Sequence, residues 1–552
     1  MPTGADDVVL GKMEGISATT AGLFCFGWAI GSSSPIARVE IADSNGRAIP
    51  GINEIAYGGR RDDIGQLHAD VPAAARSGLY FFGDRSVAST LAGMVLVFHL
   101  DSGAVLRRTW QSFKGEPAAG VPRDLNSRRW TLGHAWASAW RLLRQRKYRA
   151  VAVAVAAKFS RLPKAERDPL ARVASALAAA GDGPCTLMLD HDLGGGANAY
   201  RERRIAEQVR HGGKVVMMSY HVLTARHFVE VVTSGLCRRW ALEDLNCIAH
   251  LCRRGIFASI HYNTAVSLPE PVGIARLLVT LRGMAGVSLS VAMHDYFLLC
   301  PSHYLLDFSG TYCGVPALTR CADCLARHTD SYVARHASRD IVEWRRAWGA
   351  VLAVADDITC FSDASCRLVI KAYPDIDAGR IVVRPHVADY ARHHTLKLPS
   401  GPLCIGVVGK IGHAKGADVV KHLADKIRAR GLDVSIVVIG TMGVAADRKV
   451  VRETGPYSQG RLADIIEGSS ANLFLFHSIW PETFSYVCEE LMQFGVPLAC
   501  FDLGAPAERV AAYHSGLVIG DADRESNLLD TLIAFHERME TARQAGGTGS
   551  GG

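Results

Sequence analysis

The stretch of residues 471–508 constrains the fold of this chain more than any other part of the sequence. It contains a short apolar run at 474–476, a helical pattern over 484–494 and a second apolar run at 496–501, with Gly495 suited to end the helix. This β-loop-α-β order predicts an α/β fold with a parallel sheet. Because such sheets present ligand-binding groups after the carboxyl ends of their strands, the loop at 478–483 is the first candidate site.

Two glutamates in this stretch stand eight residues apart, Glu482 before the predicted helix and Glu490 inside it. A Glu-rich helix can show such a spacing by chance, so the surrounding residues decide how it is interpreted. They read Pro481-Glu482-Thr483-Phe484-Ser485-Tyr486, then Gly495-Val496-Pro497, then Asp502, Gly504, Ala505 and Glu508. This pattern resembles the donor-site signature of the family 4 retaining glycosyltransferases, and the resemblance extends over residues 184–521.

The resemblance implies a GT-B fold, in which two Rossmann-like domains hold a nucleotide-diphosphate sugar mainly through the second domain. It gives Glu482 a catalytic place beside the donor sugar, close to the reacting carbon, and it gives Glu490 the ribose hydroxyls. It also implies transfer with retention of the anomeric configuration and no catalytic metal. Its positive groups for the diphosphate are Lys415 and Lys410, although Lys410 stands where the family usually has arginine and lacks the bidentate fork. The amides at the predicted helix start are expected to bind the diphosphate as well, at Thr483, Phe484 and Ser485.

A first α/β domain is expected to begin near residue 184. A strand pattern at 185–189 is followed by a glycine run that includes Gly195 and Gly196, and then by a helical pattern through 209. Glycines at such a turn let the backbone approach an anion closely, and the resemblance places a glycine loop here facing the donor diphosphate; a plain flexible loop is the alternative. The spacing differs from the dinucleotide fingerprint, which argues against a dehydrogenase.

Further strands of a parallel sheet are predicted at 215–218, 256–261 and 287–293, separated by helical segments. The last runs directly into His294. A histidine at the end of a strand can donate a hydrogen bond to a sugar hydroxyl or to a developing charge. The resemblance gives a functional histidine at this place, so His294 is the second predicted catalytic residue; a structural histidine is the alternative. Acceptor choice is expected around Gly195, Asn198 and the loop after His294.

A cluster of four cysteines follows at once, at Cys300, Cys313, Cys321 and Cys324. Four cysteines with one Cys-x-x-Cys pair within 25 residues are the ligand inventory of a closed tetrahedral zinc site. We therefore expect a structural zinc ion that fixes a loop too small to build its own core. Free thiols and a redox-active pair are the alternatives.

The remaining domain boundaries follow from composition and from the positions of turn-forming residues. Residues 1–115 show short apolar runs at 23–30, 37–41, 79–82 and 95–100 with turn signals between them, which predicts a small all-β sandwich. Residues 116–183 are expected to form a basic, Trp-rich helical linker, residues 184–395 the acceptor domain with the four-cysteine insertion at 300–324, and residues 396–545 the nucleotide-sugar domain. A Gly-rich tail at 546–552 is expected to be disordered.

The positive charge of the chain is local. Residues 125–164 carry ten Lys and Arg and no Asp or Glu, so the net charge of +7 leaves −3 for the rest of the chain. Aromatic and aliphatic residues recur there at helical spacing, which favours a helix on an anionic membrane surface; a packed linker helix with solvated arginines is the alternative. Basic and aromatic residues also suit nucleic acid, but no recognition module accompanies them, and no nucleic-acid partner is expected.

These observations predict a retaining glycosyltransferase that moves a sugar from a nucleotide-sugar donor to a glycan or lipid-linked glycan acceptor in bacterial surface polysaccharide biosynthesis. The sequence shows neither a secretory signal nor an apolar run long enough to cross a bilayer, so a cytoplasmic place, peripheral on the inner membrane, is expected. A catalytically inactive glycan-binding scaffold is the main alternative. A phosphorylase, which needs a pyridoxal phosphate lysine, and a zinc-dependent nucleic-acid binder are weaker ones.

Overall fold

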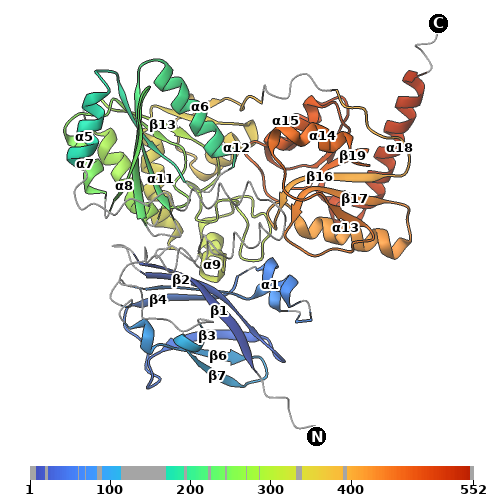
Figure 1. Ribbon diagram of the computed structural model, residues 1–552, viewed down its shortest axis with the longest axis horizontal. Coiled ribbons are helices and arrows are strands. Elements are labelled where there is room, and N and C mark those ends of the chain that lie inside the picture. The colour runs from blue at the N-terminus through green and yellow to red at the C-terminus, as the bar shows by residue number, and fades with distance from the viewer. Residues whose placement is uncertain are drawn as a thin grey trace. The chain divides into compact units, whose positions relative to one another are not determined.

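Figure 1 shows the computed structural model of the chain. It describes residues 8–547 except 19–22, 60, 69, 72, 84–86, 88–89, 114–169, 192–194, 222–225, 243–244, 269, 285, 331–332, 334–338 and 389–394. The chain divides into two compact units. The first comprises residues 1–61, 76–290 and 329–339, and the second comprises residues 62–75, 291–328 and 340–552. The basic, Trp-rich segment at 125–164 lies outside the described residues, so its predicted helix stays a prediction.

The N-terminal part of the first unit is an all-β region of two antiparallel sheets, as predicted. The first sheet has the order β1-β2-β5-β4, with bounds Val9–Ala18, Leu23–Gly31, Gly78–Gly83 and Ile52–Gly59. The second has the order β3-β6-β7, with bounds Ile36–Ala42, Val95–Leu100 and Val105–Thr109, and the short helix α2 (Trp110–Phe113) follows it. Residues of both sheets share one apolar core, in which the rings of Phe81 and Trp110 meet edge to face at 5.8 Å.

The rest of the first unit holds five neighbouring strands of a mixed sheet, in the order β11-β10-β9-β8-β12. Its strands are β8 (Cys185–Leu189), β9 (Lys214–His221), β10 (Arg226–Val232), β11 (Cys237–Leu242) and β12 (Ser259–Tyr262). β8 pairs in parallel with β9 and β12, as the alternation of strands and helices predicts. The prediction of a purely parallel sheet is wrong at its edge, because β9, β10 and β11 pair antiparallel. Only four residues separate β9 from β10 and β10 from β11, whereas a parallel pair would need a helical crossover of a dozen or more residues.

The helices of the first unit are α5 (Leu170–Ala179), α6 (Gly196–Arg210), α7 (Asn246–Arg253) and α8 (Pro271–Arg282). β13 (Ser288–Ala292) begins in the first unit and ends in the second. Its last residues lead to His294, the predicted catalytic histidine. The strand that was predicted at 287–293 is therefore confirmed with slightly shorter bounds.

The C-terminal sheet of the second unit is wholly parallel and has the strand order β18-β17-β16-β19-β20-β21. In chain order the strands are β16 (Cys404–Ile411), β17 (Ser435–Met442), β18 (Val451–Glu453), β19 (Leu473–Phe476), β20 (Leu498–Phe501) and β21 (Gly516–Ile519). Numbered from β16, this is the order 3-2-1-4-5-6 of the doubly wound nucleotide-binding folds. The protein is a mixed α/β protein with parallel sheets.

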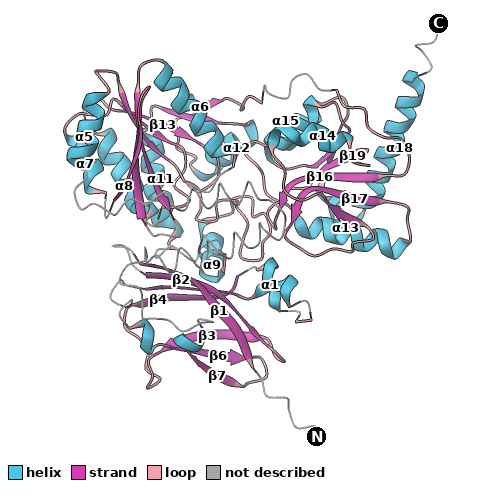
Figure 2. Ribbon diagram, viewed as in Figure 1, coloured by secondary structure: helices cyan, strands magenta, loops and turns pink. Residues whose placement is uncertain are grey.

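Helices cover both faces of this sheet, and Figure 2 shows them flanking β16 and β17. Ile405 and Val407 point to the core beneath α13 (Ala417–Arg430) and α18 (Leu528–Gly547). Cys404 and Val408, which alternate with them, point to the core beneath α14 (Leu462–Glu467) and α15 (Tyr486–Gln493). Because successive side chains of a strand face opposite sides, an apolar stretch of strand must be buried on both faces, as β16 is from Cys404 to Val408.

The remaining elements of the second unit are α1 (Asp62–Leu67), α9 (Leu318–Arg327), α11 (Ile341–Val354), α12 (Asp363–Ala372), α16 (Gly504–Ala511), α17 (Asp521–Ser526) and the parallel pair β14 (Asp357–Cys360) and β15 (Ile381–Val383). The predicted disordered tail begins too early, because α18 continues to Gly547. Residues 548–552 lie outside the described part.

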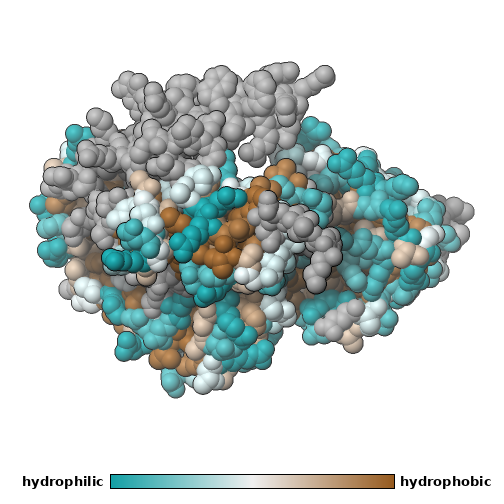
Figure 3. All heavy atoms as spheres, turned by 90° about the horizontal axis from the view of Figure 1, so that it is seen from below, coloured by the Kyte–Doolittle hydropathy of each residue, from teal (hydrophilic) through white to brown (hydrophobic). Residues whose placement is uncertain are grey.

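Within the described residues, no helix combines the length and the apolar character that crossing a membrane requires. On the face drawn in Figure 3, hydrophilic residues make up much of the described surface, and apolar residues form smaller areas. Single exposed apolar side chains such as Leu67 and Val105 are ordinary for a protein surface.

Candidate active site

Two loops of the second unit meet where the strand order of its sheet reverses. β16 and β19 are neighbours, and the chain adds strands outward from β16 on one side and from β19 on the other. Open α/β sheets bind their ligands outside the carboxyl ends of the strands at such a reversal. The loop after β16 carries Lys415 and the loop after β19 carries Glu482. The topology therefore brings two of the predicted site residues to one edge of the sheet.

Lys415 and Glu482 form an ion pair, with Lys415 Nζ 2.9 Å from Glu482 Oε1. The Glu482 side chain is 4% exposed and the Lys415 side chain is 43% exposed. A carboxylate is costly to remove from water without a compensating charge, and the lysine supplies that charge from the open side. An ammonium group has three N–H donors, so Lys415 can hold Glu482 and an added anion at the same time.

Backbone contacts fix the loop that carries Glu482. The Ile479 amide donates to the Ala414 carbonyl at 3.1 Å, and the Ser478 hydroxyl donates to the same oxygen at 3.2 Å. The Glu482 carbonyl in turn accepts from the Ala505 amide at 2.9 Å. The loop is thus tied on one side to the loop after β16 and on the other to the start of α16, which sets the position of the carboxylate.

Two glycines allow these loops to approach closely. Gly416 has φ of 76°, and a Cβ there would lie 2.1 Å from the His477 carbonyl oxygen. Gly504 has φ of 63°, and a Cβ there would lie 2.6 Å from the Glu482 carbonyl oxygen. A side chain at either position would meet backbone atoms at a distance that no real Cβ tolerates, in addition to the cost of the left-handed conformation.

The helix after Glu482 begins later than the sequence pattern predicted. α15 starts at Tyr486, and Ser485 is its N-cap, with its hydroxyl accepting from the Cys488 amide at 3.3 Å. The predicted diphosphate amides of Thr483 and Phe484 therefore precede the helix, and the first helical amides belong to Tyr486 and Val487. The prediction of helix from residue 484 is wrong because Ser485 takes the capping role that serine favours.

Glu490 lies inside α15 and is 3% exposed. Glu489 is held by Arg509 in a salt bridge. Burial raises the pKa of Tyr457 to about 12, and the neighbouring charge of Glu490 contributes to that rise. Glu490 and Glu482 are thus both buried carboxylates; Glu482 lies in the loop before the helix and Glu490 lies inside it, as the sequence pattern placed them.

The loop after β13 packs on the segment around Glu482. The Thr483 hydroxyl donates to the His294 carbonyl at 2.9 Å. The His294 ring stacks on Phe361 at 4.6 Å and on His386 at 5.4 Å, and His386 also meets Phe484 at 4.9 Å. His294 is therefore brought to the same site as Glu482 and Thr483, in agreement with its predicted neighbourhood.

Tyr296 is a residue of this site that the sequence analysis missed. It is fully buried, and its hydroxyl donates to the Pro481 carbonyl at 2.8 Å, directly before Glu482. Trp480 packs against Tyr296 at 6.2 Å and against Tyr304 at 4.5 Å between ring centroids. The contact joins positions 185 residues apart, so no local sequence pattern could predict it. The one available indication is that Tyr296 follows closely after the end of a predicted strand.

Lys410 lies within β16, opposite Thr441 of β17, and is exposed. It thus belongs to the strand, whereas Lys415 belongs to the loop that follows it. The ion pair with Glu482 is made by Lys415. The structure gives Lys415 a defined place in the site and leaves the role of Lys410 as a prediction.

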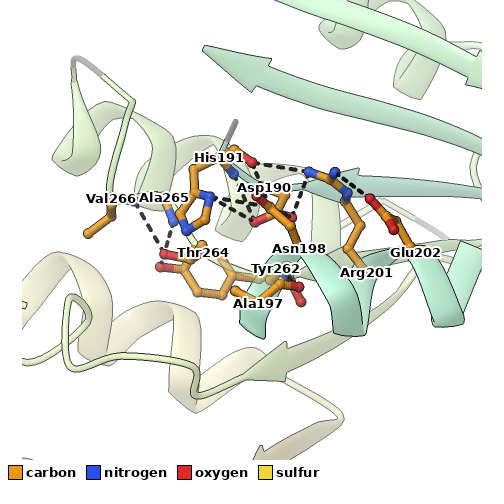
Figure 4. A network of polar contacts seen from close by, with 11 residues as sticks. Asp190, His191, Ala197, Asn198, Arg201, Glu202, Tyr262, Thr264, Ala265 and Val266 are labelled. Carbon is orange, nitrogen blue, oxygen red and sulfur yellow. Dashed lines mark hydrogen bonds and ion pairs between the residues drawn. The ribbon is translucent and has the colours of Figure 1, made fainter. Parts of the chain in front are cut away.

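Gly195 and Gly196 belong to the first unit, at the start of α6. Gly195 is the N-cap of that helix, with φ of 90°, which suits glycine. Figure 4 shows the polar network beside it: Asn198 Nδ2 and Arg201 Nη1 donate to the buried Asp190 carboxylate at 2.8 and 3.0 Å. Asp190 directly follows β8, and Asn198 and Arg201 lie three apart on one helix face. The network fixes both ends of the glycine loop. The sequence analysis missed Asp190 and Arg201. The acidic residue directly after β8 and the three-residue spacing of Asn198 and Arg201 could have indicated them.

The four cysteines that were predicted to hold zinc line one cavity of the second unit. Cys321 is buried, and Cys300, Cys313 and Cys324 are partly buried. Among the described residues, no group of three or more His, Cys, Asp or Glu side chains is arranged so that it could hold a metal ion. The predicted gathering of the thiols is present, and zinc binding itself remains a proposal.

Comparison with known proteins adds to this geometry. Residues 392–547, which contain the parallel sheet from β16 to β21, match the family described as Glycosyl transferases group 1. This part of the chain is similar to the group 1 glycosyl transferases. The matched span includes Lys415, Glu482 and Glu490.

Two named relatives agree with the family match. A GDP-mannose-dependent alpha-mannosyltransferase of Mycobacterium tuberculosis (strain CDC 1551 / Oshkosh) is 26% identical over 290 residues, which cover 50% of this chain and 72% of that protein. A D-inositol 3-phosphate glycosyltransferase of Stackebrandtia nassauensis is also 26% identical over 290 residues, covering 46% of this chain and 63% of that protein. Together these matches support a glycosyltransferase.

Among solved structures, HepE from Anabaena in complex with UDP-glucose aligns with 16% sequence identity and a TM-score of 0.39, covering 64% of this chain and 90% of that chain. The assignment of an α/β fold rests on the strand order and pairing described above.

Proposed function

We propose that this protein is a family 4-like retaining glycosyltransferase of the GT-B type. It moves a hexosyl or deoxyhexosyl group from a nucleotide-diphosphate sugar to a glycan or lipid-linked glycan acceptor. The observation that carries the proposal is the Lys415–Glu482 ion pair at the reversal point of the parallel sheet, with the buried Glu490 on the adjoining helix.

The chemistry of sugar transfer suits these residues. A nucleoside diphosphate must leave with its negative charge stabilised while positive charge develops on the sugar. Lys415 supplies a positive charge for the diphosphate, and the amino end of α15 supplies oriented amides and a positive dipole end. Glu482 accepts hydrogen bonds from donor-sugar hydroxyls, Glu490 accepts them from the ribose, and His294 donates toward the reacting sugar.

The ion pair also indicates how the two side chains are arranged before a substrate binds. Without a ligand, Lys415 neutralises Glu482. When a diphosphate binds, the ammonium group shares its donors between the phosphate and the carboxylate, and Glu482 turns its remaining lone pairs to sugar hydroxyls. The two groups are thus already placed before binding, which reduces the cost of ordering them.

The proposals for the acceptor and for the cellular location rest on the sequence. The ten positive charges at 125–164 favour an anionic membrane surface, which suits a lipid-linked acceptor on the cytoplasmic face of a bacterial inner membrane. We therefore propose a role in surface polysaccharide biosynthesis. Flotation with vesicles that contain anionic lipid tests this: binding at low salt that is lost at high salt supports it, and indifference to the vesicles contradicts it.

A catalytically inactive glycan-binding scaffold is the second candidate, because the all-β region could bind sugars on its own. The two readings differ in donor binding. A transferase must bind a nucleotide-sugar at this edge of the sheet, whereas a scaffold need not.

A thermal-shift screen over UDP-, GDP-, dTDP- and ADP-sugars, with GDP-mannose among them, tests the function. One nucleotide class should stabilise the protein. Glu490→Gln should weaken that donor by about thirtyfold, which corresponds to about 2 kcal/mol. Glu467→Ala removes an exposed carboxylate of the same unit and should leave binding unchanged. The anomeric configuration of the product, measured by NMR, then tests retention; an absence of any donor response contradicts the transferase assignment.

A further inference from the structure

Four cysteine side chains of the second unit surround one cavity of about 170 Å³. Cys321 and Cys324 project from α9, where a spacing of three residues puts them on one face. Cys300 and Cys313 come from the loop that precedes this helix. All fourteen cysteines of the chain are free thiols, so no disulfide explains why four of them gather here.

The backbone between these cysteines is held in an uncommon conformation. Leu305 and Val315 both have φ of 55°, and within the described residues they are the non-glycine residues with positive φ. Such a conformation costs about 1–3 kcal/mol per residue and persists only where the surroundings enforce it. Residues 301–317 contain neither helix nor strand beyond an isolated bridge between Leu306 and Tyr312. Hydrogen bonds hold the loop in this conformation, among them those from the Cys313 amide to the Leu305 carbonyl at 3.0 Å and from the Ser302 hydroxyl to the Leu306 carbonyl at 2.6 Å, and a metal at the four cysteines would add a further constraint.

We propose that Cys300, Cys313, Cys321 and Cys324 bind one structural zinc ion that holds this loop against the donor site. A closed structural site uses four thiolates around the metal at about 2.3 Å. In the structure the four cysteines line the cavity but are not arranged as metal ligands, so zinc binding requires their sulfurs to move toward a common point within that space. Binding releases the thiol protons, and the metal then cross-links the loop to α9.

The first link from this loop to the donor site runs through Tyr296. The Cys300 amide donates to the Tyr296 carbonyl at 3.0 Å, and the Tyr296 amide donates to the His303 carbonyl at 2.9 Å. The hydroxyl of the same tyrosine donates to the Pro481 carbonyl at 2.8 Å. A constraint at Cys300 is therefore passed by two hydrogen bonds to the residue before Glu482.

Two further contacts connect the loop with the site. The Tyr304 ring lies 4.5 Å from the Trp480 ring, and His413 Nε2 lies 3.2 Å from the Gly310 carbonyl oxygen. Trp480 precedes Glu482 by two positions, and His413 precedes Lys415 by two positions. The loop thus touches both segments that carry the ion pair. This coupling rests on the proposed function, whereas zinc binding does not.

Metal content is the first measurement. The full chain, purified under reducing conditions, should contain about one zinc ion per molecule by mass spectrometry of metals. Cys321→Ser and Cys324→Ser should lose it, and Cys237→Ser, which replaces an exposed thiol elsewhere, should keep it. Because a Ser variant can fail to fold, Co²⁺ is also added to reduced, metal-free wild-type protein. A tetrahedral thiolate spectrum supports the site; a wild-type protein without zinc that gives no such spectrum overturns it.

Donor binding is the second measurement. Chelation of the zinc should lower the affinity for the stabilising nucleotide-sugar at least tenfold, and re-addition of Zn²⁺ should restore it. An affinity that does not change after zinc removal overturns the coupling. Zinc bound at one per molecule with no response to any nucleotide-sugar contradicts the proposed function and leaves the metal site standing. Donor binding in a protein that never takes up zinc contradicts the metal site and leaves the proposed function standing.

Discussion

Lys415 and Glu482 stand 67 residues apart in the chain and 2.9 Å apart in space, each in a loop that leaves one of two adjacent strands. The carboxylate is buried and the ammonium group is half-exposed. The pair therefore has a structural role as well as a place for a ligand, because the lysine offsets the cost of burying the acid. Mutations of the two residues should not act independently.

The first prediction concerns stability. Lys415→Ala should lower the free energy of unfolding by about 2 kcal/mol, since it leaves a buried carboxylate uncompensated. Adding Glu482→Gln to that variant should recover part of the loss, because a neutral amide is less costly to bury. Urea denaturation of the two single variants and the double variant measures the coupling.

The control for this cycle is Lys421→Ala. Lys421 pairs with Asp425 at 2.6 Å, but both side chains are about half-exposed. Exposed pairs of this kind contribute about 0.5 kcal/mol or less. Equal losses for Lys415→Ala and Lys421→Ala, with no recovery in the double variant, would show that the buried pair does not stabilise the fold.

The second prediction uses the glycines at the two ends of α13. Both have left-handed φ, 76° at Gly416 and 60° at Gly431, but only Gly416 lies against backbone atoms. Gly431→Ala should cost about 1 kcal/mol for the conformation alone. Gly416→Ala should cost more and should also weaken the nucleotide-sugar, because the His477 backbone must shift. Thermal denaturation and donor titration of both variants test this; matching behaviour of the two would exclude the close approach as the cause.

The general architecture could be predicted from the sequence because it depends on local patterns of residues. Short apolar runs identified β8, β19 and β20 to within a few residues. The motif around Glu482 and Glu490 placed both carboxylates correctly relative to the strand and helix. These features depend on residues close in the chain, which is why spacing alone could find them.

Long-range contacts could not be predicted from such local patterns. Tyr296 with Pro481 and Gly310 with His413 join loops that share no periodicity, and the antiparallel strands β10 and β11 break the alternation that a parallel sheet predicts. The late start of α15 was a different failure. Ser485 is a good N-cap residue, and its capping preference outweighed the apolar periodicity that suggested a start at residue 484.

The third prediction tests the contact between Tyr296 and the Glu482 loop. Tyr296→Phe removes one buried hydrogen bond and leaves the Pro481 carbonyl without that donor, which should cost about 1 kcal/mol of stability. It should also weaken nucleotide-sugar binding, since the carbonyl adjoins Glu482. Tyr513→Phe is the matched control, because Tyr513 donates to the Val496 carbonyl at 2.9 Å, beyond the far end of α15. If both variants reduce donor affinity alike, the loss reflects general destabilisation.

The fourth prediction concerns pH and His477, which lies in the loop after β19. The side chain is 3% exposed, and its carbonyl oxygen is the atom that Gly416 approaches. Burial lowers the pKa of His477 to about 4; the Leu475 carbonyl, which accepts from the ring, opposes the fall, and the charge of Lys415 adds to it. In the unfolded chain the same ring has a pKa of about 6.5.

The sign follows from proton uptake. Between about pH 6.5 and pH 4 the unfolded chain binds a proton at His477 and the folded protein does not, so the free energy of unfolding falls as the pH falls. This one group should contribute a loss of about 3 kcal/mol across that interval, and no further loss below it. His477→Gln should flatten the pH dependence of stability in this range relative to wild type. His514→Gln, which replaces an exposed ring, should leave the wild-type slope unchanged. Urea denaturation at pH 7, 6, 5 and 4 measures all three proteins, and parallel curves for wild type and His477→Gln would mean that the ring is protonated, or solvated, in the folded state.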